Sequence, residues 1–171
     1  FYKKLNNNGL PISPDIRVTS TSQSSTYPSL DIDSQNNVHV VWQEYVAGYD
    51  IFYKKLNNNG LNLTGDIPVI NNNYPHSTNP SLSLDSQNNI HVVWNENSNT
   101  IYHAKLNVNG QMLLAPHQLI NAGFLSNFGN PVLETDSFND LHILVSSTYS
   151  TNYPALAYYH FNETGSIVPG N

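Results

Sequence analysis

Residues 28–44, PSLDIDSQNNVHVVWQE, return twice along the chain, as PSLSLDSQNNIHVVWNE at 80–96 and as the looser PVLETDSFNDLHILVSS at 131–147. A second phrase, FYKKLNNNGL at 1–10, keeps the same spacing and returns at 52–61, as YHAKLNVNGQ at 102–111 and as YYHFNETGSI at 158–167. A fixed period of this kind indicates that each copy is one supersecondary unit, which buries its apolar faces against its neighbours. The repeat therefore predicts an architecture and not an activity.

Each complete unit reads as four short strands. In the first full copy they are expected at 29–33, 38–42, 51–56 and 67–70. The first alternates polar and apolar residues, whereas the second is apolar at nearly every position, which predicts a strand covered on both faces. Asn59-Gly60 is a strong hairpin signal, and Pro68 favours an edge position for the fourth strand. Residues 44–50 are expected to form a loop.

Four antiparallel strands per unit of about 50 residues are typical of a β-propeller blade. We therefore expect a single all-β propeller segment over 1–171, with about three and a half blades. They are a half blade at 1–19 and blades at 28–70, 80–120 and 131–170. Immunoglobulin-like sandwiches need about 100 residues per unit and fit poorly. Because closed propellers have about four to eight blades, we expect a partial ring, completed by the remainder of a longer chain or by self-association.

Composition excludes several classes of partner. The net charge is −6 with only six Lys and Arg, so there is no basic stripe for a nucleic acid. No apolar run approaches the about 18 residues that a membrane span requires. The chain has no Cys, which excludes disulfides and thiolate metal sites. The sequons that begin at Asn62 and Asn162 are expected glycosylation sites, and with the low-charge, polar composition they favour an extracellular or cell-surface location.

The repeated phrase Pro-Ser-Leu-x-x-Asp-x-x-x-Asn-(Val/Ile)-His-Val-Val-Trp, followed by Phe-Tyr-Lys-Lys-Leu, resembles the blades of sialidase-like propellers built from bacterial neuraminidase repeats. The resemblance covers nearly the whole chain and implies a fold. Such blades usually carry an Asp-box, Ser-x-Asp-x-Gly-x-Thr-Trp, between strands three and four. Here 56–61 keeps the Gly but lacks the Ser, the Asp and the Trp.

The resemblance also implies what a sialidase would need. Family sialidases clamp the substrate carboxylate with three arginines, because guanidinium groups bind anions in a bidentate manner. This chain has Arg17 alone. We therefore expect no catalytic residue and no enzymatic activity, and a glycosidase fragment is the least favoured alternative.

Three histidines recur at one repeat position, His39, His91 and His142. Because they fall on different blades, we interpret them as packing residues whose rings bond a neighbouring blade. The carboxylates of Asp33, Asp85 and Asp136 precede the first turns, where Asx-type bonds to turn amides are expected. A calcium site with Asp140 is an alternative, but it lacks the required oxygens. No metal and no cofactor are expected.

The candidate binding surface follows from topology. In a four-stranded meander, the loop between strands two and three and the loop that leads to the next unit lie on the same face. Candidate ligand-binding residues there are Tyr27, Glu44, Tyr45, Tyr49, Tyr74, His76, Glu96, Phe124, Tyr149 and Tyr153. Loops on a rigid scaffold often carry function, although some of these aromatics are equally expected to fill gaps between blades.

Two hypotheses from different classes follow. The first is a non-catalytic surface module that binds a glycan or a surface protein through this aromatic face. The second is a structural module of a surface layer, sheath or filament.

Overall fold

A computed structural model describes residues 1–70, 76–121, 127–148, 154–162 and 165–168 of the chain. The described part has three antiparallel sheets and no helix. The first sheet contains β1 (Ser25–Ile32), β2 (Val38–Tyr45), β3 (Tyr49–Leu56) and β4 (Ile67–Ile70). The second contains β5 (Ser77–Leu84), β6 (Ile90–Glu96), β7 (Thr100–Leu106) and β8 (Met112–Asn121). The third contains β9 (Phe128–Thr135), β10 (Leu141–Thr148) and β11 (Pro154–Phe161).

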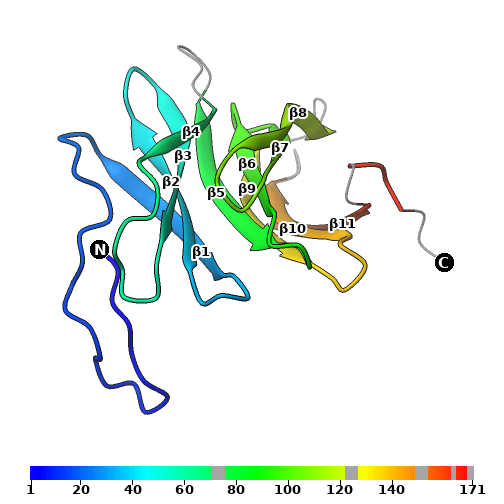
Figure 1. Cartoon of the computed structure of the whole chain (residues 1–171). Helices are drawn as coiled ribbons and strands as arrows, with labels where there is room; N and C mark the ends of the chain where they lie inside the picture. The colour runs from blue at the N-terminus through cyan, green and yellow to red at the C-terminus, as the bar shows by residue number, and fades with distance from the viewer. Residues whose placement is uncertain (71–75, 122–126, 149–153, 163–164, 169–171) are drawn as a thin grey trace.

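In each sheet the strands pair in chain order, so each unit is a meander (Figure 1). We call these sheets the first, second and third unit. Four-stranded antiparallel units in tandem are the arrangement that the repeat predicts for a propeller. Pro68 lies on the edge strand β4, as expected, because β4 pairs only with β3. In the third unit, the expected beginning of a fourth strand is a single bridge between Phe161 and Ile167.

The first turn of each unit is closed by its aspartate. Asp33 Oδ1 accepts hydrogen bonds from the backbone amides of Gln35 at 2.9 Å and Asn37 at 2.8 Å. Asn36 adopts a φ of 64°, which asparagine tolerates better than most residues. The same bonds recur in the other units, at Asp85 and Asp136. The predicted Asx-type role is confirmed.

Neighbouring units contact each other through the first strand of each sheet, and we call these strands, β1, β5 and β9, the inner strands. The Leu82 amide donates to Ser29 Oγ at 3.2 Å, and one period later the Leu133 amide donates to Ser81 Oγ at 3.1 Å. Because the donor and the acceptor stand at fixed repeat positions, each unit offers the same polar edge to the unit that follows it. The three sheets therefore follow one another in space in the same order as the repeats in the sequence (Figure 1).

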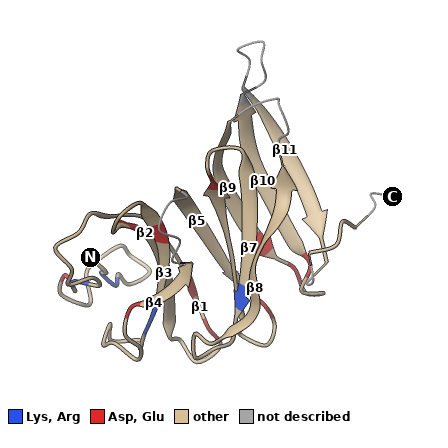
Figure 2. Ribbon diagram, turned by 90° about the horizontal axis from the view of Figure 1, so that it is seen from above, with Lys and Arg blue, Asp and Glu red and all other residues tan. Residues whose placement is uncertain are grey.

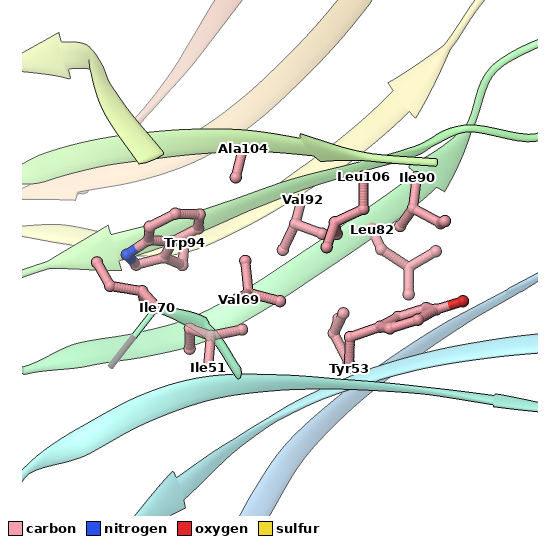
Figure 3. Close-up of a cluster of buried hydrophobic side chains, with 11 residues drawn as sticks. Ile51, Tyr53, Val69, Ile70, Leu82, Ile90, Val92, Trp94, Ala104 and Leu106 are labelled. Carbon is pink, nitrogen blue, oxygen red and sulfur yellow. The ribbon is translucent and has the colours of Figure 1, made fainter. Parts of the chain in front are cut away.

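The main core lies between the first and second sheets (Figure 3). Its buried members are Val41, Ile51, Tyr53, Val69, Ile70, Leu82, Ile90, Val92, Trp94, Ala104 and Leu106. A second core joins the second and third sheets around Val93, Ile101, Leu133 and Ile143. The predicted two-sided burial of the second strand is confirmed for β2 and β6. It is wrong for β10, because Leu144 points away from the second unit and no described sheet covers it.

Residues 1–19 contribute less regular structure than the expected half blade. They carry isolated bridges between Tyr2 and Ile16 and between Leu5 and Pro11. Tyr2 and Val18 pack against Val38, Val40 and Trp42 of the first unit. A cavity of about 190 Å³ remains beside them, lined in part by Leu30.

The three sheets do not close into a ring within the described segments. No helix in those segments has the length and hydrophobicity needed to cross a membrane.

Candidate functional site

An aromatic cluster lies where β2 and β3 meet. The predicted loop over 44–50 is shorter than expected, because Tyr45 ends β2, Tyr49 begins β3, and the two form the last pair of the ladder. Their ring centroids are 5.2 Å apart in an edge-to-face arrangement. The His76 ring, which precedes the second unit, lies 6.1 Å from that of Tyr49. The two predicted connections therefore do meet on one face, and we call Tyr45, Tyr49 and His76 the loop-face cluster.

A shallow depression lies at the same end of the sheets, between the inner strands. Its volume is about 180 Å³, and it is lined by Tyr27, Pro28, Asn79, Pro80, Ser81, Asn130 and Pro131. Tyr27 and Asn79 have φ values of 51° and 54°. A shift of register accompanies each, between Thr26 and Ser29 and between Thr78 and Ser81. These bulges turn polar and aromatic side chains toward the depression, which is a recurrent use of bulges at binding sites.

Tyr27 is among the residues that the sequence predicts for this surface, whereas Asn79 and Asn130 are not. The signal that identifies them is an x-Pro dipeptide at the same point of each repeat, Tyr27-Pro28, Asn79-Pro80 and Asn130-Pro131. Proline lacks an amide donor, so its recurrence inside a strand marks an interruption of the ladder. The backbone amide of Asn79 donates instead to Gln43 Oε1 of the first unit, at 2.8 Å.

Glu44 and Glu96 do not lie in loops, contrary to the expectation. Both are buried strand residues, in β2 and β6. Glu44 Oε2 accepts from the Trp42 indole at 3.0 Å and from Ser25 Oγ at 2.8 Å. Glu96 repeats these bonds in the second unit. Each carboxylate reaches the indole N–H because residues two apart on a strand share one face of the sheet. Both carboxylates are engaged inside the sheets.

Four of the predicted aromatics, Tyr74, Phe124, Tyr149 and Tyr153, lie outside the described residues. The sequon asparagine Asn62 is exposed, and its Thr64 hydroxyl accepts from the Lys55 amide at 2.9 Å. The sequon at Asn162 extends beyond the described residues. Glycosylation at either site stays a prediction.

A polar network recurs at the opposite end of the sheets. In the first unit, His39 Nε2 lies 3.2 Å from Asp33 Oδ2, and its Nδ1 lies 2.9 Å from the Tyr53 hydroxyl. Lys55 Nζ lies 3.0 Å from the same Asp33 oxygen. All four side chains belong to one sheet, so the expectation that the histidine bonds a neighbouring blade is wrong. The ring is buried against that blade, but both of its nitrogens bond within their own unit.

Burial controls the protonation states of this network. Burial alone would raise the pKa of Asp33, but hydrogen bonds from Asn37, Lys55 and His39 reverse that effect and hold the pKa well below its usual range. Burial lowers the pKa of His39, and Asp33 only partly offsets the effect. The pKa of Tyr53 is raised by burial and by the Asp33 charge. At neutral pH the Asp33 carboxylate is therefore ionised, and the rings of His39 and Tyr53 are uncharged.

The second unit repeats the network with one exchange. His103 replaces the tyrosine, and its Nε2 lies 3.1 Å from His91 Nδ1. Lys105 Nζ lies 2.9 Å from Asp85 Oδ2. Burial, with the nearby Lys105 charge, lowers the pKa of His91 to about 4. Burial also lowers the pKa of His103.

The third unit changes the set of side chains. His160 stands opposite His142, at the ladder position where Lys55 faces His39 and Lys105 faces His91. Asp136, His142 and His160 each offer one potential metal-ligand atom, and these atoms lie within 4.8 Å of one another. Asp140 is adjacent, with Oδ2 at 3.1 Å from His160 Nε2.

Arg17 is engaged locally. Its Nε donates to the Thr19 carbonyl at 2.6 Å and its guanidinium also reaches the Thr21 carbonyl at 3.2 Å. The few Lys and Arg residues lie in the N-terminal segment, in β3 and in β7 (Figure 2).

No protein-family model matches the chain, and no curated protein matches it. Several solved structures do match the chain. The chain is similar to the Hadza microbial sialidase Hz136, with a TM-score of 0.66 and 12% identity over 94% of this chain and 42% of that one. It is similar to a PL25 ulvan lyase bound to -[GlcA(1-4)Rha3S]-, with a TM-score of 0.59 and 12% identity over 81% of this chain and 41% of that one. It is also similar to the endo-arabinase from Bacteroides thetaiotaomicron VPI-5482, with a TM-score of 0.59 and 14% identity over 86% of this chain and 60% of that one.

The chain thus spans between 41% and 60% of the length of these three proteins. At such identities the likeness shows the fold, a propeller-type arrangement of four-stranded units. It supports the sequence resemblance to sialidase-like propellers at that level.

Proposed function

We propose that this chain is a non-catalytic carbohydrate-binding module of propeller type, which binds a glycan at the end of the sheets that carries the loop-face cluster. The observation that carries the proposal is the meeting of Tyr45, Tyr49 and His76 at that end, close to the start of the inner strands. Tyr27 and Tyr45 leave large parts of their rings exposed.

The chemistry of this end suits a sugar. Aromatic rings offer flat apolar faces with a polar tip, which pack against the C–H face of a pyranose. The amides of Asn79 and Asn130 at the depression both donate and accept, as alternating sugar hydroxyls require. The sialidase, the ulvan lyase and the endo-arabinase named above act on carbohydrates by their descriptions, which is consistent with this proposal.

We also propose that this module lies outside the cell and has no catalytic activity. A module of this kind acts on the outside of a cell, as the expected sequons at Asn62 and Asn162 favour. Arg17 already bonds two carbonyls of its own segment, so it is not poised to clamp a substrate carboxylate. We expect no turnover of a fluorogenic sialoside or of arabinan by the purified chain, and turnover that Arg17→Ala abolishes would contradict this.

A glycan array tests the binding directly. Wild-type protein is screened, and the affinity for the best glycan is compared with those of Tyr49→Ala and Phe138→Ala. Phe138 is the matched control, because it is an exposed aromatic in a turn at the opposite end of the third unit. We expect Tyr49→Ala to weaken binding about tenfold or more, as the loss of about 1.4 kcal/mol of ring contact would do, and Phe138→Ala to leave it unchanged. Equal effects of the two variants would contradict the assignment.

A second candidate function is an assembly module, which is favoured by the outer faces of the first and third sheets, because no other described sheet covers them. Leu30 and Ile32 of the first unit and Val132, Leu144 and Leu156 of the third are exposed. Exposed apolar faces of this kind mark interaction surfaces. We propose that the units belong to a larger ring or stack, completed by further units of a longer chain or by a second copy. Light scattering should show a dimer or larger species that Leu156→Asp disperses, and a monomer at high concentration would contradict completion by a second copy.

A further inference from the structure

The third unit carries a set of side chains that differs in kind from the equivalent set in the first two. Where the first unit has Asp33, Asn37, His39 and Lys55, the third has Asp136, Asp140, His142 and His160. The ladder pairs His142 with His160 as it pairs His39 with Lys55, so the substitution is position for position. The exchange removes an ammonium group and adds a carboxylate and an imidazole.

The removed ammonium group has a defined task in the first two units. Lys55 and Lys105 place Nζ 3.0 Å and 2.9 Å from Oδ2 of Asp33 and Asp85, respectively. Each buried carboxylate is thus neutralised by a cation that the chain itself supplies. No Lys or Arg among the described residues pairs with Asp136 or Asp140, although two carboxylates now share the site. The third unit therefore keeps the anionic half of the network and lacks the cation.

The remaining atoms are arranged as ligands. His142 Nε2 lies 3.3 Å from Asp136 Oδ2, and His160 Nε2 lies 3.1 Å from Asp140 Oδ2. The two imidazole rings stack with centroids 4.6 Å apart. Apart from its contact with Asp136, His142 Nε2 is shielded from solvent and makes no hydrogen bond within the described residues.

Neighbouring bonds fix the orientation of these ligands. The backbone amides of Phe138 and Asp140 donate to Asp136 Oδ1, at 2.8 Å and 3.0 Å, which turns the other oxygen toward the histidines. The Tyr158 hydroxyl lies 2.7 Å from His142 Nδ1. A partner on one ring nitrogen that leaves the other free is the usual way in which proteins orient a metal-binding histidine.

From this we infer that Asp136, His142 and His160, with Asp140 as a fourth ligand, form a binding site for a divalent transition-metal ion. Two imidazoles and two carboxylates suit Zn²⁺, Ni²⁺ or Cu²⁺ and are poor ligands for Ca²⁺, which takes about six to eight oxygens. The metal stands in for the lysine ammonium of the other units. The recurrence of His39, His91 and His142 alone predicts no metal here, because the signal is the exchange of Lys55 and Lys105 for His160 at one ladder position.

The ligand atoms of Asp136, His142 and His160 need only a small movement, and Asp140 already contacts His160. A tetrahedral Zn²⁺ site with bonds of about 2.0–2.1 Å separates its ligand atoms by roughly 3.3 Å. The two nitrogen–oxygen separations of 3.3 Å and 3.1 Å already have this size, and the ligand atoms of Asp136, His142 and His160 lie within 4.8 Å of one another. The four side chains are partly exposed, so an ion can enter from solvent.

Titration of the metal-free chain with Zn²⁺ alone, followed by calorimetry, tests the inference. The key variant is His160→Lys, which installs the residue of the first two units and is therefore expected to fold. The second variant is Asp136→Asn, and the matched control is Asp15→Asn, an exposed carboxylate of the N-terminal segment. We expect one Zn²⁺ per chain, a loss of affinity of at least about 100-fold in both site variants, and unchanged affinity in the control.

Two further readouts separate a built site from surface histidines. Tyr158→Phe should weaken Zn²⁺ about 10–100-fold, since it removes only the partner of His142 Nδ1. NMR of the imidazole nitrogens should place the metal on His142 Nε2 and the proton on Nδ1. Failure of the wild-type chain to bind Zn²⁺ would overturn the inference, and so would affinity that survives His160→Lys in a variant shown by circular dichroism to be folded.

Discussion

One repeat position is exposed in the first unit and buried in the two units that follow it. Leu30 of the first unit is 55% exposed, whereas its equivalents Leu82 and Leu133 are 4% and 2% exposed. On the other face the order is reversed, because Val41 and Val93 are fully buried and Leu144 is 41% exposed. The residues are alike, so the difference is made by the neighbouring unit. The core of this fold lies between sheets, and a single sheet has no core of its own.

The repeat has diverged most in the third unit. In the first two units, the Trp42–Glu44 and Trp94–Glu96 pairs are buried and nearly identical. The third unit has Val145 and Ser147 at these positions. Its Asp–His network has changed as well, on the face that no described unit covers. Enclosure between two units does not explain this divergence, because Val145 is buried in the second core, whereas Trp42 is covered by residues of the N-terminal segment.

The largest effect is expected from the enclosed indole. Trp94→Ala removes a fully buried side chain from the core of Figure 3, and we expect the free energy of unfolding to fall by about 3–5 kcal/mol. Leu144→Ala, on the open face, should change it by less than about 1 kcal/mol. Urea denaturation of both variants checks this, and comparable losses would show that the open face is covered in solution.

A matched pair of leucines gives a sharper version of the comparison. We expect Leu82→Ala to lower the free energy of unfolding by about 2–5 kcal/mol, because it leaves a cavity between two sheets. Leu30→Ala, at the same repeat position, should cost about 0.5 kcal/mol or less. If the two variants are equally destabilised, the first unit must have a partner that covers Leu30.

Acid should weaken the interior network. Burial lowers the pKa of His91 from 6.5 to about 4, so between these values the unfolded chain takes up a proton that the folded chain does not. The contribution of His91 to stability should therefore be lost as the pH decreases from about 6.5 to about 4, for a total of about 3 kcal/mol from this group. Below about pH 4 the lowered pKa values of Asp33 and Asp85 should continue the decline. His91→Gln should reduce the slope without abolishing it, since the pKa values of His39 and His103 are lowered as well. An unchanged slope in His91→Gln would contradict the assignment.

The strand pattern was predictable because it is local. Alternation, Asp33-type turns and Asn-Gly hairpins depend on neighbours in sequence, and they repeat. The partners of Glu44 and His39 were not identified, because their charge and polarity suggest exposure while cross-strand neighbours decide their contacts. The loop-face cluster was predicted from topology. The asparagines of the depression were not, since their role depends on bulges at Asn79-Pro80 and Asn130-Pro131 that bring separate units together.

The smallest expected effect concerns the side chain of one asparagine that bonds a neighbouring unit. Asn88 Oδ1 accepts from the Ser34 amide of the preceding unit at 2.9 Å, and Asn88 Nδ2 donates to Ser34 Oγ at 3.0 Å. Asn36 has a similar positive φ, but its side chain makes no such bonds to a preceding unit within the described residues. Asn88→Ala should therefore cost about 1 kcal/mol more than Asn36→Ala in the free energy of unfolding. Equal costs, measured in urea, would mean that these bonds contribute no stability.

The most direct test of the proposed binding face is an NMR titration of the labelled chain with the best glycan from the array. The account predicts that the amide and ring signals of Tyr27, Tyr45, Tyr49 and His76 shift together and saturate with one affinity. Signals of Phe138 and of the Asp136–His160 site should stay in place. Shifts confined to the open faces around Leu30 or Leu144, with the loop-face cluster unmoved, would contradict it.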